Sequence, residues 1–495
     1  MFWLVSVVSL LILSYMWIKK KYRYFENKGL PFYPHPKFPL GNLWGVGKVK
    51  HSGLFIGDIY EYLKKKDILG GVFYFVRPIV VPIDLDLIKE ILVKDFSAFH
   101  DRGIYVNERD DPLSGTLIAL PGQRWKNLRT KLTPTYTAKK LKMMHGTMTA
   151  VAKEFEECLN KHTGQDVEFA DIISRFTTDI IGSVAFGIEC NTLKDPNAEF
   201  LKMAKKVSDV RGIKFLKRFF LTLFPNVGRT LHMSTTPKDV ADFFMGTLRE
   251  IINHRESNNI KRDDFLELLM QIKNTGQVDG ENVGRMSFDE LAAQTFLFFI
   301  AGYGTSAFTT TFALYELAVN KNVQDRARDE VMEILKKHGE FSYEASMEMK
   351  YIDQVIKETL RLHPILPNLI RTLSHHYTIP NRNVTFEKGT FFSIPVFGIH
   401  RDPHIYPNPN EFDPERFTEE NIKSRHSCAW LPFGEGPRGC IGKRFGIMEI
   451  KIALGTLLSK FTIQPTSRTP IPMVYEPTVT ILTPKGGMWL KIDKI

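Results

Sequence analysis

One cysteine stands in a glycine-rich loop near the carboxyl end of the chain, in the segment FGEGPRGCIG at residues 433–442. Beyond Cys440, the apolar residues Phe445 and Ile452 fall at helical spacing, so a helix is expected to begin just after the loop. The unpaired N–H groups at the start of a helix favour a thiolate, and Arg438 adds positive charge. A thiolate held in this way suits the axial position of a haem iron. A buried structural cysteine is the alternative.

Five positions of this loop resemble the F-x-x-G-x-R-x-C-x-G signature of the cytochrome P450 superfamily: Phe433, Gly436, Arg438, Cys440 and Gly442. The resemblance implies that Cys440 is the axial ligand of the iron of haem b and takes part in catalysis. It implies that Arg438 pairs with a haem propionate and that Phe433 packs near the sulfur. It also implies a mainly α fold with small β-sheets, in which a long central helix lies over the haem.

The sequence predicts such a helix over residues 288–319, where apolar residues run on without a proline. Ser287 and Glu290 form a capping box at its start. At 1.5 Å per residue the helix would be about 50 Å long, and a helix so apolar must cross the core. Strands are expected at 72–76 and 79–81, with Arg77-Pro78 as their turn, and again at 479–482 and 488–492.

Within this helix lies the run Ala301-Gly302-Tyr303-Gly304-Thr305. Each mid-helix glycine costs about 1 kcal/mol relative to alanine. Close approach of a flat ligand at Gly302 would offset that cost, and helix–helix packing is the alternative. The run is similar to the family's oxygen groove, A-G-x-[D/E]-T, which implies that Ala301 and Gly302 contact the cofactor. By that match Thr305 is catalytic and holds water and dioxygen for protonation.

The chain departs from this pattern at Gly304, where the family usually has an acidic residue. A carboxylate relays protons well because its pKa can be tuned to the working pH. Without it, proton delivery rests on Thr305, water and the backbone. We therefore expect looser coupling, with more reduced oxygen released as peroxide.

A second group of charged residues is expected to be structural. Glu358 and Arg361 lie three residues apart on a helix with apolar neighbours, which predicts a buried ion pair that needs further partners. Arg416, in the segment DPERF, offers a second arginine. Both segments match family signatures, E-x-x-R and P-E-R-F. The resemblance implies that the three side chains interlock on the cysteine side of the haem.

Further cations are expected at the haem propionates. Trp125 and Arg129 lie four residues apart on one helical face, where both can donate to one carboxylate. An ordinary amphipathic turn is the alternative. The pair matches the family's W-x-x-x-R. By resemblance, Arg371 and Arg102 also contact propionates.

The substrate pocket is expected to be apolar, since 12% of the residues are aromatic and 37 are phenylalanine. For each candidate contact, a place in the plain core is the alternative. The candidates are Phe296, Ile300, Ala301, Leu366, Ile370 and Val479.

The first residues predict a membrane anchor. Residues 1–20 are mostly apolar, and a basic cluster follows at once. The length is at the short end for a bilayer span, and the charge bias places the following body in the cytosol. A cleaved signal peptide is the alternative, but neither a basic n-region nor a cleavage site is evident. Residues 21–42 then form a basic, proline-rich linker, and residues 43–495 the catalytic domain.

The net charge is +11, from 66 basic and 55 acidic residues. No nucleic-acid motif accompanies it, so a membrane surface or an acidic partner is the expected target. The four cysteines show neither paired nor zinc-type spacing, which fits a reducing compartment. Lys443 and Arg444, directly after the cysteine loop, are candidates for docking an electron donor.

The whole chain looks most like insect microsomal members of the superfamily that metabolise xenobiotics. The resemblance implies a monooxygenase of the endoplasmic reticulum membrane, which takes electrons from NADPH through a cytochrome reductase or a cytochrome b-type donor. Its lipophilic substrate would be an insecticide, a plant toxin or an endogenous lipid or hormone. Two alternatives stay open: a haem-thiolate isomerase or dehydratase that acts on peroxides without dioxygen, and a non-catalytic haem-binding membrane protein. NADPH-dependent oxygen uptake separates them.

Overall fold

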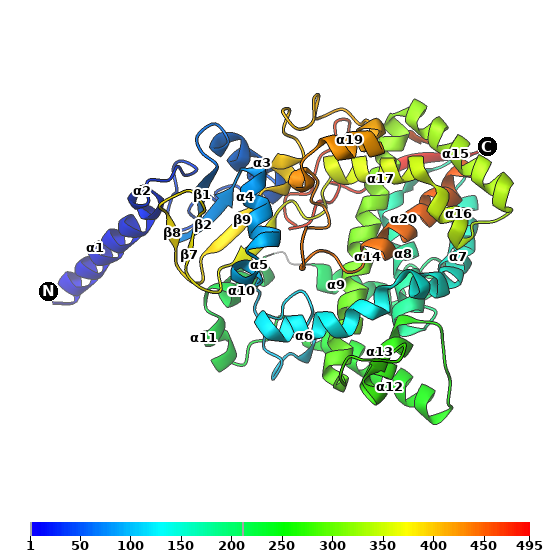
Figure 1. Ribbon diagram of the computed structural model, residues 1–495, viewed down its shortest axis with the longest axis horizontal. Coiled ribbons are helices and arrows are strands. Elements are labelled where there is room, and N and C mark those ends of the chain that lie inside the picture. The colour runs from blue at the N-terminus through cyan, green and yellow to red at the C-terminus, as the bar shows by residue number, and fades with distance from the viewer. Residues whose placement is uncertain (1, 210–211) are drawn as a thin grey trace.

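The structure is a computed structural model that describes residues 2–209 and 212–495 (Figure 1). Helices make up most of it: α1 Phe2–Tyr22, α2 Tyr24–Asn27, α3 Ser52–Leu63, α4 Leu85–Lys89, α5 Phe96–Phe99, α6 Gly122–Leu132, α7 Ala138–Asn160, α8 Phe169–Ile181, α9 Glu199–Ser208, α10 Ile213–Leu223, α11 Pro225–Thr230, α12 Lys238–Ser257, α13 Phe265–Thr275, α14 Phe288–Val319, α15 Lys321–His338, α16 Tyr343–Glu348, α17 Lys350–Leu362, α18 Val396–Ile399, α19 Glu419–Ser424 and α20 Lys443–Leu458.

The strands are short and form small sheets. The first sheet has the order β1-β2-β9-β6 and the second β10-β11-β3, while β4-β5 and β7-β8 are two-stranded. Their bounds are β1 Leu69–Tyr74, β2 Arg77–Pro82, β3 Asp166–Glu168, β4 Gln277–Val278, β5 Glu281–Asn282, β6 Leu369–Thr372, β7 Tyr377–Thr378, β8 Thr385–Phe386, β9 Phe391–Ile394, β10 Phe461–Pro465 and β11 Trp489–Lys494.

Helix α14 crosses the core, with the bounds that the sequence predicts. Its capping box is formed: the Ser287 hydroxyl accepts from the Glu290 N–H at 3.1 Å, and the Ser287 N–H donates to the Glu290 carboxylate at 3.0 Å. Among the described residues, α14 is the helix long and apolar enough to cross a membrane, yet 67% of that stretch is buried in the protein. It is a core helix, packed against α8, α17 and α20 (Figure 1).

The buried apolar residues form two clusters. One contains the side chains of α14, and the other contains those of the four-stranded sheet. Strands β1 and β2 are antiparallel, with Leu69 opposite Pro82 and Tyr74 opposite Arg77. Their turn therefore lies at residues 75–76, where Phe75 adopts a left-handed φ of 56°, and not at Arg77-Pro78. Both of those residues belong to β2, because proline is tolerated at the start of a strand.

The expected strand at 479–482 is wrong. These residues form bends, and the nearest ladder contact is the isolated bridge between Tyr475 and Pro484. The segment is held by its backbone instead, since the Leu482 N–H donates to the carbonyl of Ile365 at 3.0 Å. The strand expected at 488–492 forms as β11, which lies between β10 and β3 in its sheet.

Helix α1 extends away from the body, with exposed side chains that include Trp3, Leu10 and Trp17 (Figure 1). The segment after it packs on the first sheet. Phe25 is 0% exposed, and a Cβ built on Gly71 of β1 would lie 2.2 Å from its ring. Part of the expected linker is thus docked on the body.

Polar contacts hold the same segment. The Tyr24 hydroxyl donates to Glu387 at 2.6 Å, and the Lys28 ammonium pairs with that carboxylate at 2.9 Å. Further on, the Asn42 side chain accepts from the Phe73 N–H at 2.9 Å. The membrane anchor itself stays a prediction.

Candidate functional site

The cysteine loop is tightly folded directly before α20. The Cys440 N–H donates to the carbonyl of Phe433 at 2.9 Å. Gly434 and Gly436 have φ values of 68° and 70°, in the left-handed region that favours glycine. A Cβ built on Gly436 would lie 2.1 Å from the carbonyl oxygen of Leu92, so this backbone approach requires glycine.

The surroundings of the Cys440 thiol act on its pKa in two directions. Burial raises the pKa of Cys440, and the Gly442 N–H, Arg129 and Arg102 lower it. The N–H group at the start of the helix thus favours the thiolate, and burial opposes it. The Cys440 side chain is nevertheless exposed, so the sulfur is open to a ligand. A metal ion at the sulfur would favour the deprotonated form.

Arg438 organises the loops around the cysteine. Its guanidinium donates to the carbonyls of His100, Leu117 and Leu120 at 2.7, 3.0 and 2.7 Å, and lies 4.1 Å from the centre of the Trp125 ring.

Two other predicted arginines contact the same loop. Arg102 donates to the carbonyl of Arg438 at 3.0 Å, and Arg129 donates to the carbonyl of Gly439 at 3.0 Å. The fold thus brings Trp125, Arg129, Arg102 and Arg438 together.

Among the described residues, the carboxylate of Asp101 is the one that forms an ion pair with this arginine cluster. Burial and mutual repulsion lower the pKa of Arg438 and of Arg371 to about 9, and that of Arg102 to about 10. The Asp101 carboxylate lies 3.7 Å from Arg438, too far for a strong hydrogen bond. Arg371 is 1% exposed, and its Nε has no hydrogen-bond partner among the described residues. A cofactor that carries two carboxylates beside an iron atom fits these residues.

The oxygen-groove run lies in the middle of α14. The Thr305 hydroxyl donates to the carbonyl of Ala301 at 2.6 Å, and both residues keep some exposure. A Cβ built on Gly304 would meet only the side chain of Ile481, at 3.9 Å, so a larger residue has room there.

Gly302 packs against a neighbouring helix, whereas the sequence analysis expected the close approach of a flat ligand. A Cβ built on it would lie 2.4 Å from the Ile181 side chain of α8. The missing side chain therefore makes room for helix–helix packing, which was the alternative reading. Contact between the Gly302 backbone and a cofactor stays a prediction.

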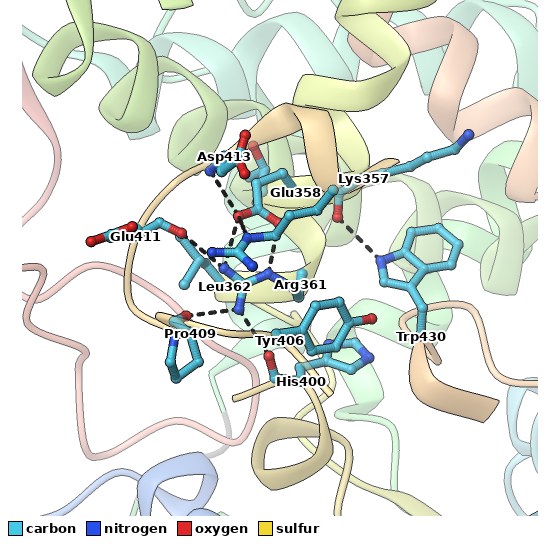
Figure 2. A network of polar contacts seen from close by, with 12 residues as sticks. Lys357, Glu358, Arg361, Leu362, His400, Tyr406, Pro409, Glu411, Asp413 and Trp430 are labelled. Atoms are coloured by element: carbon cyan, nitrogen blue, oxygen red, sulfur yellow. Dashed lines mark hydrogen bonds and ion pairs between the residues drawn. The ribbon is translucent and has the colours of Figure 1, made fainter. Parts of the chain in front are cut away.

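The pair of Glu358 and Arg361 on α17 is 0% exposed and doubly bonded, with N–O distances of 2.6 and 2.8 Å (Figure 2). Arg361 also donates to the carbonyls of His400, Pro409 and Glu411, at 2.9, 2.7 and 3.0 Å. Each of its five N–H groups therefore has an acceptor.

The Glu358 carboxylate has partners beyond Arg361. It accepts from the Asp413 N–H at 2.9 Å and lies 3.4 Å from Arg416. The three side chains thus interlock as the resemblance implies. They tie α17 to residues 400–416 (Figure 2).

The candidate substrate contacts differ in exposure. Phe296 is 3% exposed and packs against Phe244 of α12 with ring centres 5.0 Å apart, so it is a core residue in this structure. The others keep accessible surface and stay predictions: Leu366 and Ile370 are exposed, and Ile300, Ala301 and Val479 are half-buried.

One neighbour of the site, Tyr136, was not singled out from the sequence: its ring would lie 3.9 Å from a Cβ on Gly442, beside the cysteine. Burial, and then the charge of Cys440, raise the pKa of Tyr136. An isolated tyrosine carries no local signal, so only the fold identifies it. Ile481, which faces Gly304, lies in the segment 479–482, where Val479 was a predicted substrate contact.

Comparisons with known proteins agree with this arrangement. A sequence model described as Cytochrome P450 matches residues 34–491. Cytochrome P450 6A1 of Musca domestica is 42% identical over 100% of this chain and 98% of its own length. From Drosophila melanogaster, Cytochrome P450 6a2 is 41% identical and Probable cytochrome P450 6a23 is 40% identical, each over 99% of both chains.

The mostly helical fold and the cysteine loop are those of a haem-thiolate monooxygenase. The chain belongs to the cytochrome P450 family and is of the insect type.

Proposed function

We propose that this protein inserts one oxygen atom of O2 into a lipophilic substrate, with electrons from NADPH delivered by a membrane-bound cytochrome reductase. The observation that carries the proposal is an accessible thiol beside a cluster of buried arginines, for which the described residues supply one carboxylate, that of Asp101 at 3.7 Å from Arg438. Haem bound by this thiol would supply the oxygen activation, and a thiolate ligand favours O–O cleavage.

The residues of the chain have separate roles in this proposal. Cys440 would ligate the iron, and Arg438, Arg371 and Arg102 would pair with the carboxylates of the cofactor. Trp125 and Arg129 complete that cation-rich side, and Phe433 packs near the sulfur. Such charge-assisted hydrogen bonds fix the position of a planar ligand.

On the opposite side, Thr305 orients water in the groove of α14. Apolar surface at Ile300, Leu366 and Ile370 orients the substrate and excludes bulk water. A xenobiotic such as an insecticide or plant toxin, or an endogenous lipid, fits such a surface.

The electron donor docks on the cysteine side of the molecule, where Lys443 and Arg444 are both exposed on the first turn of α20. Helix α1 anchors the protein in the endoplasmic reticulum membrane, so that donor and acceptor share one surface. The cytosolic body then takes up substrates that partition into lipid.

Co-expression with a reductase, followed by mass spectrometry across a panel of lipophilic compounds, tests the proposal. We expect a product heavier by one oxygen atom that is not formed without NADPH. We also expect Cys440→Ser to lose both the product and the red-shifted Soret peak of the reduced carbon-monoxide form. Retention of that peak and of the product in this variant would refute the role of Cys440.

A further inference from the structure

A buried histidine near the start of the chain holds a segment that lies beside the oxygen groove. His51 directly precedes α3 and is 1% exposed. Its Nε2 lies 3.2 Å from the carbonyl oxygen of Ile481, which stands 430 positions later in the chain. The Ile481 side chain in turn faces Gly304, where a built Cβ would lie 3.9 Å from it. One residue thus links His51 to the groove of α14.

The hydrogen bonds of His51 determine which ring nitrogen carries the proton. Its Nδ1 accepts from the Gly53 N–H at 2.9 Å, and this bond caps the first turn of α3. In a neutral ring the nitrogen that accepts carries no proton, so Nε2 carries it and donates to Ile481. Burial lowers the pKa of His51, whereas the carbonyls of Ile481 and Val479 act in the opposite direction.

The segment 476–483 depends on single hydrogen bonds for its position, because its residues form turns and bends instead of a strand. The Leu482 N–H donates to the carbonyl of Ile365 at 3.0 Å, and the preceding carbonyl, that of Ile481, accepts from His51. Leu482 is 0% exposed, whereas Ile481 keeps some exposure. The two bonds therefore turn Leu482 into the core and Ile481 towards α14.

A second chain of buried hydrogen bonds fixes the base of this segment. The Tyr475 hydroxyl lies 2.8 Å from Nδ1 of His363, and Nε2 of His363 lies 2.7 Å from the Glu316 carboxylate of α14. An ionised carboxylate can only accept, so Nε2 donates to Glu316 and Nδ1 accepts from Tyr475. The base is thus tied to α14, and His51 determines where Ile481 lies above it.

We propose that His51 is a positioning residue that determines specificity, because it holds Ile481 beside Gly304. This inference rests on the proposed function. The branched Ile481 side chain borders the space that the absent side chain of Gly304 leaves open. A substrate therefore reaches the groove with a slender, unbranched portion, and its branched portions are kept out. Without the bond from Nε2, Ile481 moves away and branched positions are oxidised as well.

Two substitutions of His51 separate its two hydrogen bonds. The short amide of His51→Asn is a good helix cap and keeps the bond to Gly53, but it does not reach Ile481. The longer amide of His51→Gln places an N–H group where Nε2 lies, and it is a poor cap. Hydrogen exchange of the holoprotein, followed by mass spectrometry, should be faster in residues 476–483 of His51→Asn and at the start of α3 in His51→Gln. Parental exchange of residues 476–483 in His51→Asn, or equal loosening of both places in both variants, would overturn the proposal.

The sites of oxidation test specificity, with NADPH, a reductase and a lipophilic probe that carries both a tert-butyl and an n-butyl group. We expect the share of product oxidised at the tert-butyl group to rise severalfold in His51→Asn and in Ile481→Ala. In His51→Gln it should stay at the parental value. His162→Asn is the matched control, since the Nδ1 of His162 lies 2.8 Å from the carbonyl of Cys158, far from α14 in the chain.

The double variant of His51→Asn with Ile481→Ala shows whether one residue acts through the other. Its product ratio should equal that of Ile481→Ala alone, because His51 has no further effect once the branched side chain is absent. An unchanged ratio in His51→Asn, or independent effects in the double variant, would refute the positioning role. If the parent forms no oxygenated product from any compound of the panel, the proposed function fails instead, and hydrogen exchange still tests the hold on Ile481.

Discussion

Substitution of Arg361 by lysine keeps the positive charge of the side chain but reduces its number of hydrogen-bond donors. It therefore tests how much the hydrogen bonds of Arg361 contribute to stability. The guanidinium has five N–H donors and five acceptors: two oxygens of Glu358 and the carbonyls of His400, Pro409 and Glu411. An ammonium keeps the charge but has three donors, so at least two buried acceptors lose their partner. At about 1–3 kcal/mol for each unsatisfied group, Arg361→Lys should cost about 2–6 kcal/mol.

For 495 residues the entropy of unfolding is about 1 kcal/mol per degree, so this cost lowers the thermal midpoint by about 2–6 °C. The midpoint is measured on the holoprotein by haem absorbance and circular dichroism at one scan rate. Arg262→Lys is the control, since Arg262 is about half exposed and pairs with Asp264 at 3.4 Å. It should shift the midpoint by less than about 1 °C. Equal shifts of the thermal midpoint in Arg361→Lys and Arg262→Lys would contradict the argument from the number of hydrogen-bond donors.

Three other outcomes are expected. Gly436→Ala should lose most of its bound haem, measured as haem per protein, whereas Gly389→Ala, also left-handed but with no atom within 4 Å of its Cβ, should keep it. For Glu449 of α20, which is 0% exposed and whose folded pKa of about 8 exceeds its usual 4.5, the stability contribution is complete below pH 4.5 and lost as the pH rises through 8. Between those values the parent should lose on the order of 5 kcal/mol relative to Glu449→Gln, seen as diverging thermal midpoints; parallel curves would refute the burial argument. Gly304→Glu should lower the peroxide-to-product ratio while Gly304→Ala leaves it unchanged, and an unaltered ratio in both would count against a missing acid.

The sequence predicted those elements that are determined by residues close together in the chain. The capping box and unbroken apolar run gave α14 its bounds, and the spacing after Cys440 predicted α20. The pairing of Glu358 with Arg361 follows from their separation on one helix face.

Other features depend on contacts that are distant in sequence. The mid-helix Gly302 is explained by Ile181, which lies 121 positions earlier in the chain, and no local pattern reveals that neighbour. The first hairpin turns at residues 75–76, and not at the predicted Arg77-Pro78, because Phe75 adopts a left-handed conformation. Glu449 is the one acidic residue of α20, but its missing hydrogen-bond partners become visible only in the fold.

The docking of Phe25 limits how far the amino terminus can be shortened. Removal of α1 takes away exposed apolar surface together with the Tyr22 ring, which packs against Phe73 with ring centres 5.1 Å apart, whereas a truncation past residue 25 also leaves the first sheet without the fully buried ring of Phe25. Loss of a buried phenylalanine costs about 3–5 kcal/mol. A truncated protein that begins at Arg23 should thus stay folded and become easier to keep in solution, and one that begins at Phe32 should aggregate.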